Sequence, residues 1–158
     1  MFGGLLMRKF AVVKDEFLKY GVKAEEIKIP VRATRTSVAY DVYSPIQETI
    51  APGETKLIFS NLKAYFEDDE VLYMATTSGM GKRGLMLAQG VAVIESDYAD
   101  NVSNDGNLGF MLYNHSANEI VINKGDKIGQ CWFAKFLVVD NEETPTGVRT
   151  GGFGSTKK

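Results

Sequence analysis

The 158-residue sequence is poor in several residue types, and each shortage limits what the protein can be. Its one cysteine, Cys131, cannot form a disulfide within the chain, which favours a reducing compartment such as the cytoplasm. Its one histidine, His115, excludes a metal site built from several histidines. No apolar run approaches the roughly 18 residues that a membrane span needs. The start, MFGGLLMRKF, lacks the apolar core of a secretory signal. We therefore expect a cytoplasmic protein with no membrane partner.

The charges nearly balance, with 18 Lys and Arg residues against 20 Asp and Glu residues. Domains that bind nucleic acid carry a clear excess of basic residues, so we expect no stable nucleic-acid binding. Hydrophobic residues make up 44% of the chain and charged residues 24%, which is typical of a globular domain and not of disorder. The length fits one domain of ordinary size.

Sixteen glycines and four prolines indicate many turns. Short strand-like runs lie between the turn signals, and we predict strands at 9–13, 38–43, 56–66, 71–75, 85–94, 108–113, 119–123 and 128–139. Many short strands at this spacing are typical of a β sandwich or barrel. Apolar residues at near-helical spacing predict one helical piece, Asp15–Ile27. We predict loops at Thr76–Gly84 and Val102–Asn107.

The strand pattern stops at Asn141, which divides the chain into a single β-barrel domain, residues 1–140, and a glycine-rich C-terminal arm, residues 141–158. The arm carries Arg149 and Phe153 among glycines and hydroxyl groups. Such a segment is either a flexible tail or a strap over a phosphate-bearing ligand. In the second case its N–H groups and hydroxyls bind oxygens, the arginine adds charge and the phenylalanine contacts a base.

Two common nucleotide-binding motifs are matched only in part, because the neighbouring residues do not fit them. Gly79–Gly84 matches G-x-G-x-x-G, but a β-like apolar run follows where the dinucleotide fold needs a helix. Lys82 is followed by Arg83, so the segment is not a phosphate-binding P-loop. A different pair, Glu95 and Asp97, lies two residues apart at the end of an apolar strand and would share a face if the strand continued. Such a carboxylate is either a general base for water or a solvated strand end.

Five short motifs occur in a fixed order along the chain: AYDVYS (39–44), TSG (77–79), VAVIESDY (91–98), GDKIGQ (125–130) and RTGGFGST (149–156). Together they resemble the five motifs of the trimeric dUTP pyrophosphatase (dUTPase) family. The extended loop DNVSNDGN (100–107) is similar to the variant found in Gram-positive bacteria and their phages.

The resemblance implies an all-β fold, a jelly-roll-like distorted β barrel with a short N-terminal helical segment and a mobile C-terminal arm. It also implies a homotrimer whose sites are shared between subunits and closed by the arm. The implied reaction is the hydrolysis of dUTP to dUMP and pyrophosphate. Mg²⁺ would be held mainly through the substrate triphosphate and not by dedicated protein ligands.

The resemblance also implies roles for individual residues. Glu95 would activate the water that attacks the α-phosphate, and Asp41 would support the site through hydrogen bonds. Tyr98 would pack on the deoxyribose and exclude a 2′-hydroxyl, while Phe153 would stack on the base. The substrate-binding residues carried over from the motifs are Thr77, Ser78, Gly79, Gln89, Ala92, Ile94, Tyr98, Gly109, Gln130, Arg149, Phe153, Gly154 and Ser155.

The sequence departs from the family pattern at four of these positions. Glu95 stands where the family has aspartate and Thr77 where it has arginine, and Gln89 and Ala92 replace asparagine and glycine. These departures leave two alternatives to an active dUTPase. One is a catalytically impaired relative that binds nucleotide or a regulatory protein partner. The other is a relative of the dCTP deaminases, which share the fold and use a glutamate.

Overall fold

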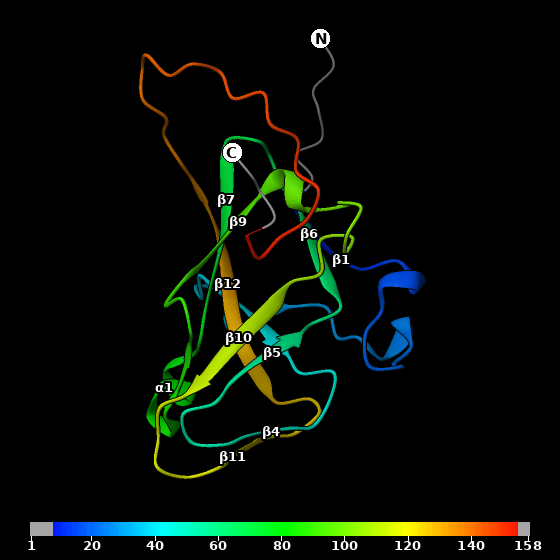
Figure 1. Ribbon diagram of the computed structural model, residues 1–158, viewed down its shortest axis with the longest axis vertical. Helices are drawn as coiled ribbons and strands as arrows, with labels where there is room; N and C mark the ends of the chain where they lie inside the picture. The colour runs from blue at the N-terminus through cyan, green and yellow to red at the C-terminus, as the bar shows by residue number, and fades with distance from the viewer. Residues whose placement is uncertain (1–7, 155–158) are drawn as a thin grey trace.

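Antiparallel strand pairing organises the structure, a computed structural model that describes residues 8–154 (Figure 1). The largest sheet has five strands in the order β2-β3-β12-β7-β9, with bounds Val31–Arg32, Tyr40–Tyr43, Lys127–Lys135, Glu70–Ala75 and Ala92–Glu95. A three-stranded sheet has the order β5-β10-β8, with bounds Thr55–Phe59, Gly109–Asn114 and Leu85–Leu87. Two further pairs are β1 with β6, Lys9–Val12 and Leu62–Tyr65, and β4 with β11, Glu48–Ile50 and Ile120–Ile122.

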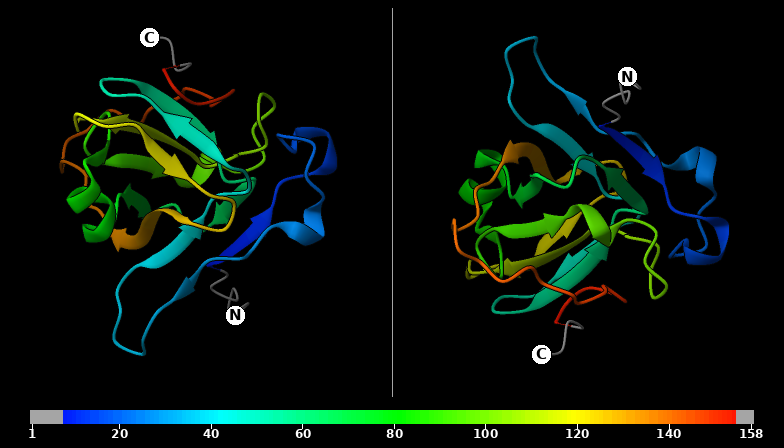
Figure 2. Two further views of the ribbon diagram at one scale, coloured as in Figure 1. Left: turned by 90° about the horizontal axis from the view of Figure 1, so that it is seen from below. Right: turned by 90° about the horizontal axis from the view of Figure 1, so that it is seen from above.

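The sheets surround a common interior (Figure 2). Buried apolar side chains fill it and form one core. Leu72 of β7, Phe110 of β10 and Ile128 of β12 are fully buried there, so the two larger sheets share the same interior. Cys131 also lies in this core, and burial raises the pKa of its thiol to about 12. The expected all-β, jelly-roll-like barrel is confirmed. The predicted strands all have a counterpart, but the runs 56–66 and 85–94 each form two strands, β5 with β6 and β8 with β9. The short strands β2 and β4 were missed.

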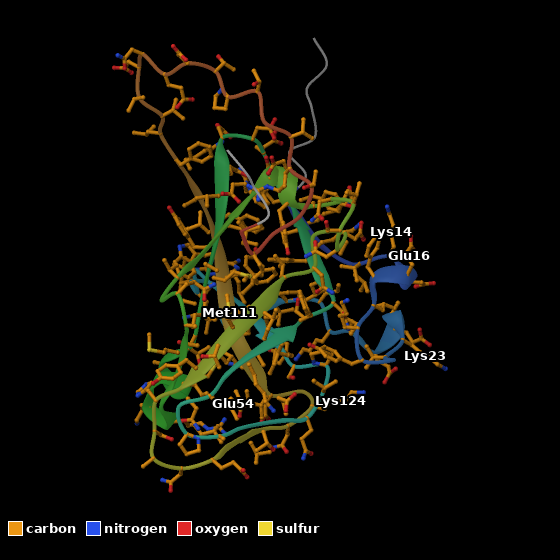
Figure 3. The ribbon with its side chains drawn as sticks, in the orientation of Figure 1. Lys14, Glu16, Lys23, Glu54, Met111 and Lys124 are labelled. Atoms are coloured by element: carbon orange, nitrogen blue, oxygen red, sulfur yellow. The ribbon has the colours of Figure 1, made fainter. Side chains whose placement is uncertain are left out.

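The N-terminal segment Asp15–Ile27 does not form the single helical piece that the sequence predicted. Asp15–Phe17 and Ala24–Glu26 form two single turns of 3-10 helix. The backbone at Tyr20 and Gly21 has positive φ angles of 69° and 65°, which no right-handed helix can include. Charged side chains project from this segment away from the barrel (Figure 3).

The predicted loop at Thr76–Gly84 was wrong, because an α-helix, α1 (Ser78–Arg83), occupies most of it. The Thr77 hydroxyl caps its start by accepting a hydrogen bond from the Met80 N–H at 3.3 Å. Met80 is buried in the core and anchors the helix. Gly84 ends it in the left-handed conformation, at φ +93°, which glycine adopts without strain. A third 3-10 turn, Ser96–Tyr98, follows β9.

The chain after β12 forms neither helix nor strand up to Gly154 (Figure 1). Strand β12 ends at Lys135, four residues before the predicted end at Val139. The segment then leaves the barrel and returns to lie beside the Ser96–Tyr98 turn, where Arg149 contacts Asp97. In the described part of the chain, no helix has the length and apolarity to cross a membrane.

Candidate active site

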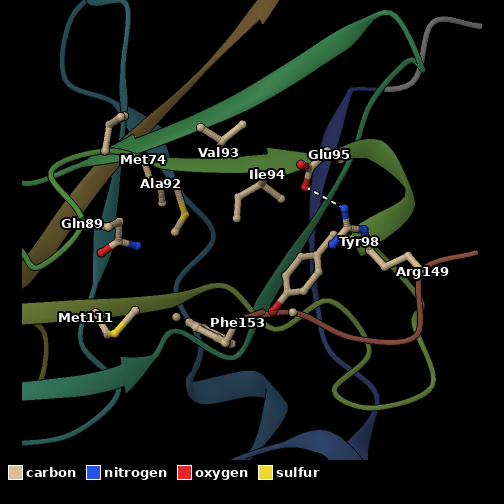
Figure 4. Close-up of a pocket in the computed structure, with 13 residues that line it drawn as sticks. Met74, Gln89, Ala92, Val93, Ile94, Glu95, Tyr98, Met111, Arg149 and Phe153 are labelled. Carbon is tan, nitrogen blue, oxygen red and sulfur yellow. Dashed lines mark ion pairs between the residues drawn. The ribbon is translucent and has the colours of Figure 1, made fainter. Parts of the chain in front are cut away.

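A cavity of about 210 Å³ opens between β9 and β10, and the C-terminal arm lies along one side of it (Figure 4). Its lining comes from three strands, two turns and the arm: Met74, Gln89, Val91, Ala92, Val93, Ile94, Glu95, Tyr98, Gly109, Met111, Arg149, Gly152 and Phe153. Eight of the predicted site residues are among them. The structure therefore joins the third motif of the sequence to the fifth.

Alternate side chains of β9 face this cavity. Ala92 and Ile94 point into the space between β9 and β10, and Val93 points away from it (Figure 4). The register fixes this arrangement, because Ala92 lies opposite Met74 of β7 and Ile94 opposite Leu72. Gln89 lies in the turn before β9, at the opposite end of the cavity from Glu95.

Tyr98 forms a rigid wall of the cavity. Its side chain is buried, and its hydroxyl donates to the Asn107 carbonyl at 2.9 Å. The same oxygen accepts a hydrogen bond from the Asn104 side-chain amide at 2.8 Å. Burial raises the pKa of the Tyr98 phenol, although the Asn104 donor and the nearby Arg149 act in the opposite direction.

Two glycines allow the arm to approach the cavity. A Cβ atom on Gly152 would lie 2.6 Å from Cε2 of Tyr98, so the arm's backbone lies directly on the tyrosine ring. A Cβ atom on Gly109 would lie 2.9 Å from Cζ of Phe153. Phe153 packs edge-on against Phe59, with ring centroids 5.9 Å apart. The aromatic residue of the arm thus rests in the mouth of the cavity.

Two carboxylates hold the arm's arginine at the edge of the cavity. The Arg149 guanidinium lies 3.1 Å from Glu95 Oε2 and 2.6 Å from Asp97 Oδ1. The shared-face argument assumed that the strand continues to Asp97, and this was wrong. Strand β9 ends at Glu95, and Asp97 belongs to the following 3-10 turn. Both side chains nevertheless reach one cation, because the turn folds back on the strand end.

The remaining predicted residues form a second group, at the other end of the five-stranded sheet. Gln130 lies opposite Asp41 on one side and Ala75 on the other. Its amide donates to the Thr76 carbonyl at 3.2 Å, directly before Thr77, Ser78 and Gly79. The spacing of strands and residues in a sheet separates the Cα atoms of Gln130 and Glu95 by roughly 16 Å. The structure therefore does not bring this group into the cavity of its own chain.

Asp41 in this second group has a charged partner that the sequence did not suggest. Its Oδ2 lies 2.9 Å from Nζ of Lys127, which comes from the neighbouring strand β12. The hydrogen bond to Asp41 raises the pKa of Lys127. Gly154 is exposed at the end of the described chain, and Ser155 lies outside the described residues.

A family model described as dUTPase matches residues 25–157 of the chain. The chain belongs to the dUTPase family. A deoxyuridine 5′-triphosphate nucleotidohydrolase of Lactococcus lactis is 44% identical over 132 residues, which cover 82% of this chain and 88% of the relative. The enzyme of the same name from Rattus norvegicus is 30% identical over 148 residues, covering 91% of this chain and 69% of the rat protein.

Solved structures of dUTPases share the fold. The crystal structure of dUTPase from Streptococcus mutans has a TM-score of 0.73 at 28% identity, covering 84% of this chain and 99% of that chain. The dUTPase of the Staphylococcus aureus phage phi11 has a TM-score of 0.69 at 16% identity, covering 95% of this chain and 99% of that chain, and supports the fold alone. The resemblance to dUTPases of Gram-positive bacteria and phages is confirmed.

Proposed function

We propose that this protein hydrolyses dUTP to dUMP and pyrophosphate in the cytoplasm. The observation that carries the proposal is the cavity between β9 and β10, which places a carboxylate, an arginine and an aromatic ring around one small opening. Family membership and the name of the Lactococcus lactis relative support the same reaction.

The nucleoside would occupy the cavity. The backbone of Gln89, Ala92 and Ile94 would contact uracil, and Phe153 would cover the base. Tyr98, whose side chain is buried, would pack against the sugar and exclude a 2′-hydroxyl. The arm, residues 141–158, acts in this proposal as a mobile segment that closes over the nucleotide.

Glu95 is the residue that we propose as the general base. Its carboxylate is 54% exposed at the rim of the cavity, so water reaches it directly. Carboxylate oxygens accept a proton from water as that water attacks phosphorus. Charge then develops on the phosphate oxygens, and fixed donors and cations such as Arg149 stabilise it.

The phosphates need the second group of residues, which lies too far from Glu95 within one chain. We propose that a neighbouring subunit of a homotrimer supplies Asp41, Ser78, Gly79 and Gln130 to each cavity. Strand β9 is the last strand of its sheet, so one edge has no partner in the described chain. Glu95 also lines a shallow apolar depression beside Tyr73, Val93 and Phe136. An apolar surface that reaches the catalytic carboxylate is suited to a subunit interface.

Mg²⁺ would enter with the triphosphate. Asp97 reaches the same guanidinium as Glu95 and offers carboxylate oxygens of the type that this ion prefers, so the residues present fit an ion held mainly by the phosphates. When bound, the ion would neutralise part of the charge on the phosphate oxygens.

The test is pyrophosphate release from dUTP in Mg²⁺, with dTTP, dCTP and UTP as comparison substrates. We expect release from dUTP above all others, and loss of release in Glu95→Gln. Glu119→Gln is a matched control, because Glu119 is an exposed carboxylate directly before β11 and does not line the cavity. Binding of dUTP without release would favour the impaired regulator, and ammonia release from dCTP would favour the deaminase. Either result would contradict the proposal.

A further inference from the structure

The loop after Tyr98, residues Asp100–Asn107, is held together by side-chain amides. Asn101 accepts hydrogen bonds from the N–H groups of Ser103 and Asn104, at 3.0 and 3.1 Å. Its own amide donates to the Tyr98 carbonyl and to Oδ1 of Asn104, both at 2.7 Å. The Gly106 N–H donates to the same oxygen of Asn104 at 3.0 Å. These bonds fix the position of the Asn104 side chain.

The amide of Asn104 has only one orientation that fits its surroundings. Its oxygen accepts from two donors within the loop, so its nitrogen faces the Tyr98 hydroxyl. That hydroxyl already donates its proton to the Asn107 carbonyl and can only accept from Asn104. The phenol is thus held on two sides by groups of one loop.

A buried ion pair ties this loop to the barrel. Nζ of Lys63, on β6, lies 2.9 Å from Asp105 and 2.6 Å from Asp100. The Asp105 side chain is almost fully buried and also accepts a hydrogen bond from the Lys14 N–H at 2.8 Å. Because Asp105 follows Asn104 directly, the loop cannot shift as a unit without breaking this buried pair.

The same loop contacts the arm. The Ser103 hydroxyl donates to the Thr150 carbonyl at 2.5 Å, and Gly152 lies on the Tyr98 ring two residues later. The arm therefore packs on a surface that the loop and Tyr98 form together.

We propose that Asn104 is a positioning residue that fixes the Tyr98 ring as the wall against the 2′ position of the sugar, and so sets the preference for dUTP over UTP. This inference rests on the proposed function. A buried ring held by two hydrogen bonds excludes an added hydroxyl more strictly than a ring that can tilt. Asn104 touches no substrate atom in this account and acts only through the Tyr98 hydroxyl.

The experiment compares kcat/KM for dUTP and UTP in Asn104→Leu, which keeps the branching at Cγ and removes the donor. A net hydrogen bond of ordinary strength predicts that the ratio of the two values falls by about 2- to 10-fold. Asn118→Ala is the control, because this exposed asparagine makes its contacts through its backbone, and we expect it to keep the wild-type ratio. An unchanged ratio in folded Asn104→Leu overturns the inference.

A double-mutant cycle separates positioning from general loosening of the loop. Tyr98→Phe removes the hydroxyl and keeps the ring. If Asn104 acts through that hydroxyl, Asn104→Leu lowers the ratio in the wild-type background and not in Tyr98→Phe. An equal fall in both backgrounds overturns the inference.

The affinities for dUMP and UMP, measured by calorimetry, report the preference for deoxyribose over ribose without turnover. If the wild-type protein proved inactive, the proposed reaction would be contradicted, but this binding test of Asn104 would still apply. In protein labelled with ¹³Cζ-tyrosine, the Tyr98 signal should move in Asn104→Leu and stay in Asn118→Ala. A Tyr98 signal that does not move also overturns the inference.

Discussion

The guanidinium of Arg149 lies 3.1 Å from the carboxylate of Glu95 within the same chain. The arm thus places its positive charge on the group that we propose as the base. Glu95 would act on water through its carboxylate oxygens, and the guanidinium contacts one of them. The triphosphate carries more negative charge than one carboxylate and would compete with Glu95 for the same guanidinium.

The first prediction concerns the chemistry of Glu95. Replacing it with glutamine keeps the shape and removes the basic oxygen, so we expect kcat to fall by about 100- to 10,000-fold. Nucleotide affinity should change little, because the cavity lining stays intact. Glu95→Asp keeps the carboxylate and should retain turnover. A Glu95→Gln protein as active as the wild type would exclude Glu95 as the base.

The second prediction concerns docking of the arm. Asp97→Asn weakens the ion pair with Arg149, and exposed pairs of this kind contribute up to about 1 kcal/mol. Trypsin should then cut after Arg149 up to about 5-fold faster, measured by mass spectrometry of the released peptide. Asp140→Asn is the control, because Asp140 is exposed on the segment that leads to the arm. Equal cleavage rates in both variants would show that Asp97 does not hold the arm.

The third prediction tests whether two subunits build each site. Glu95→Gln and Gln130→Ala proteins should each be nearly inactive. When equal amounts are unfolded together and refolded as a mixture, about a quarter of all sites combine an intact Glu95 with an intact Gln130 from the neighbour. Recovery of activity to that level supports a shared site. If both residues act within one chain, the mixture stays inactive.

The fourth prediction concerns the buried lysine of β6. Lys63→Met leaves the buried Asp105 without its main cation, and loss of one partner from a buried pair costs about 3–5 kcal/mol. Urea unfolding at a fixed protein concentration measures the change in unfolding free energy. Lys124→Met is the matched control, because Lys124 pairs with the exposed Glu26, and its loss should cost less than about 1 kcal/mol. Equal losses in the two variants would contradict the anchoring role of Lys63.

The fifth prediction concerns acid stability. Hydrogen bonds from the Arg8 guanidinium lower the pKa of Glu70 below its ordinary value of 4.5, although burial opposes this effect. A lowered pKa in the folded state means that Glu70 stabilises the protein fully above pH 4.5 and loses this contribution as the pH falls through its folded pKa. In Glu70→Gln, unfolding free energy measured by urea should depend less on pH below 4.5 than in the wild type. An unchanged acid dependence would show that Glu70 is not the responsible group.

Local sequence predicted the strands better than the helical pieces. Strand alternation and turn residues are local signals, so the predicted strands appear near their expected positions. The six-residue helix α1 is too short for a periodic pattern and depends on the Thr77 cap and on Met80 reaching the core. Asp15–Ile27 had apolar spacing suited to a helix, but the positive φ angles at Tyr20 and Gly21 interrupt it.

The sequence by itself determined the all-β class, the order of the five motifs and the identity of eight residues that line the cavity. The tertiary structure alone decided which of them meet. Register between β7 and β9 places Glu95 at one end of the sheet, while the register of β12 places Gln130 at the other. The tertiary structure also brought Lys63 to Asp105, because contacts between distant segments depend on how sheets pack and leave no periodic signal along the chain. The loop conformation brought Asn104 to Tyr98, six residues earlier.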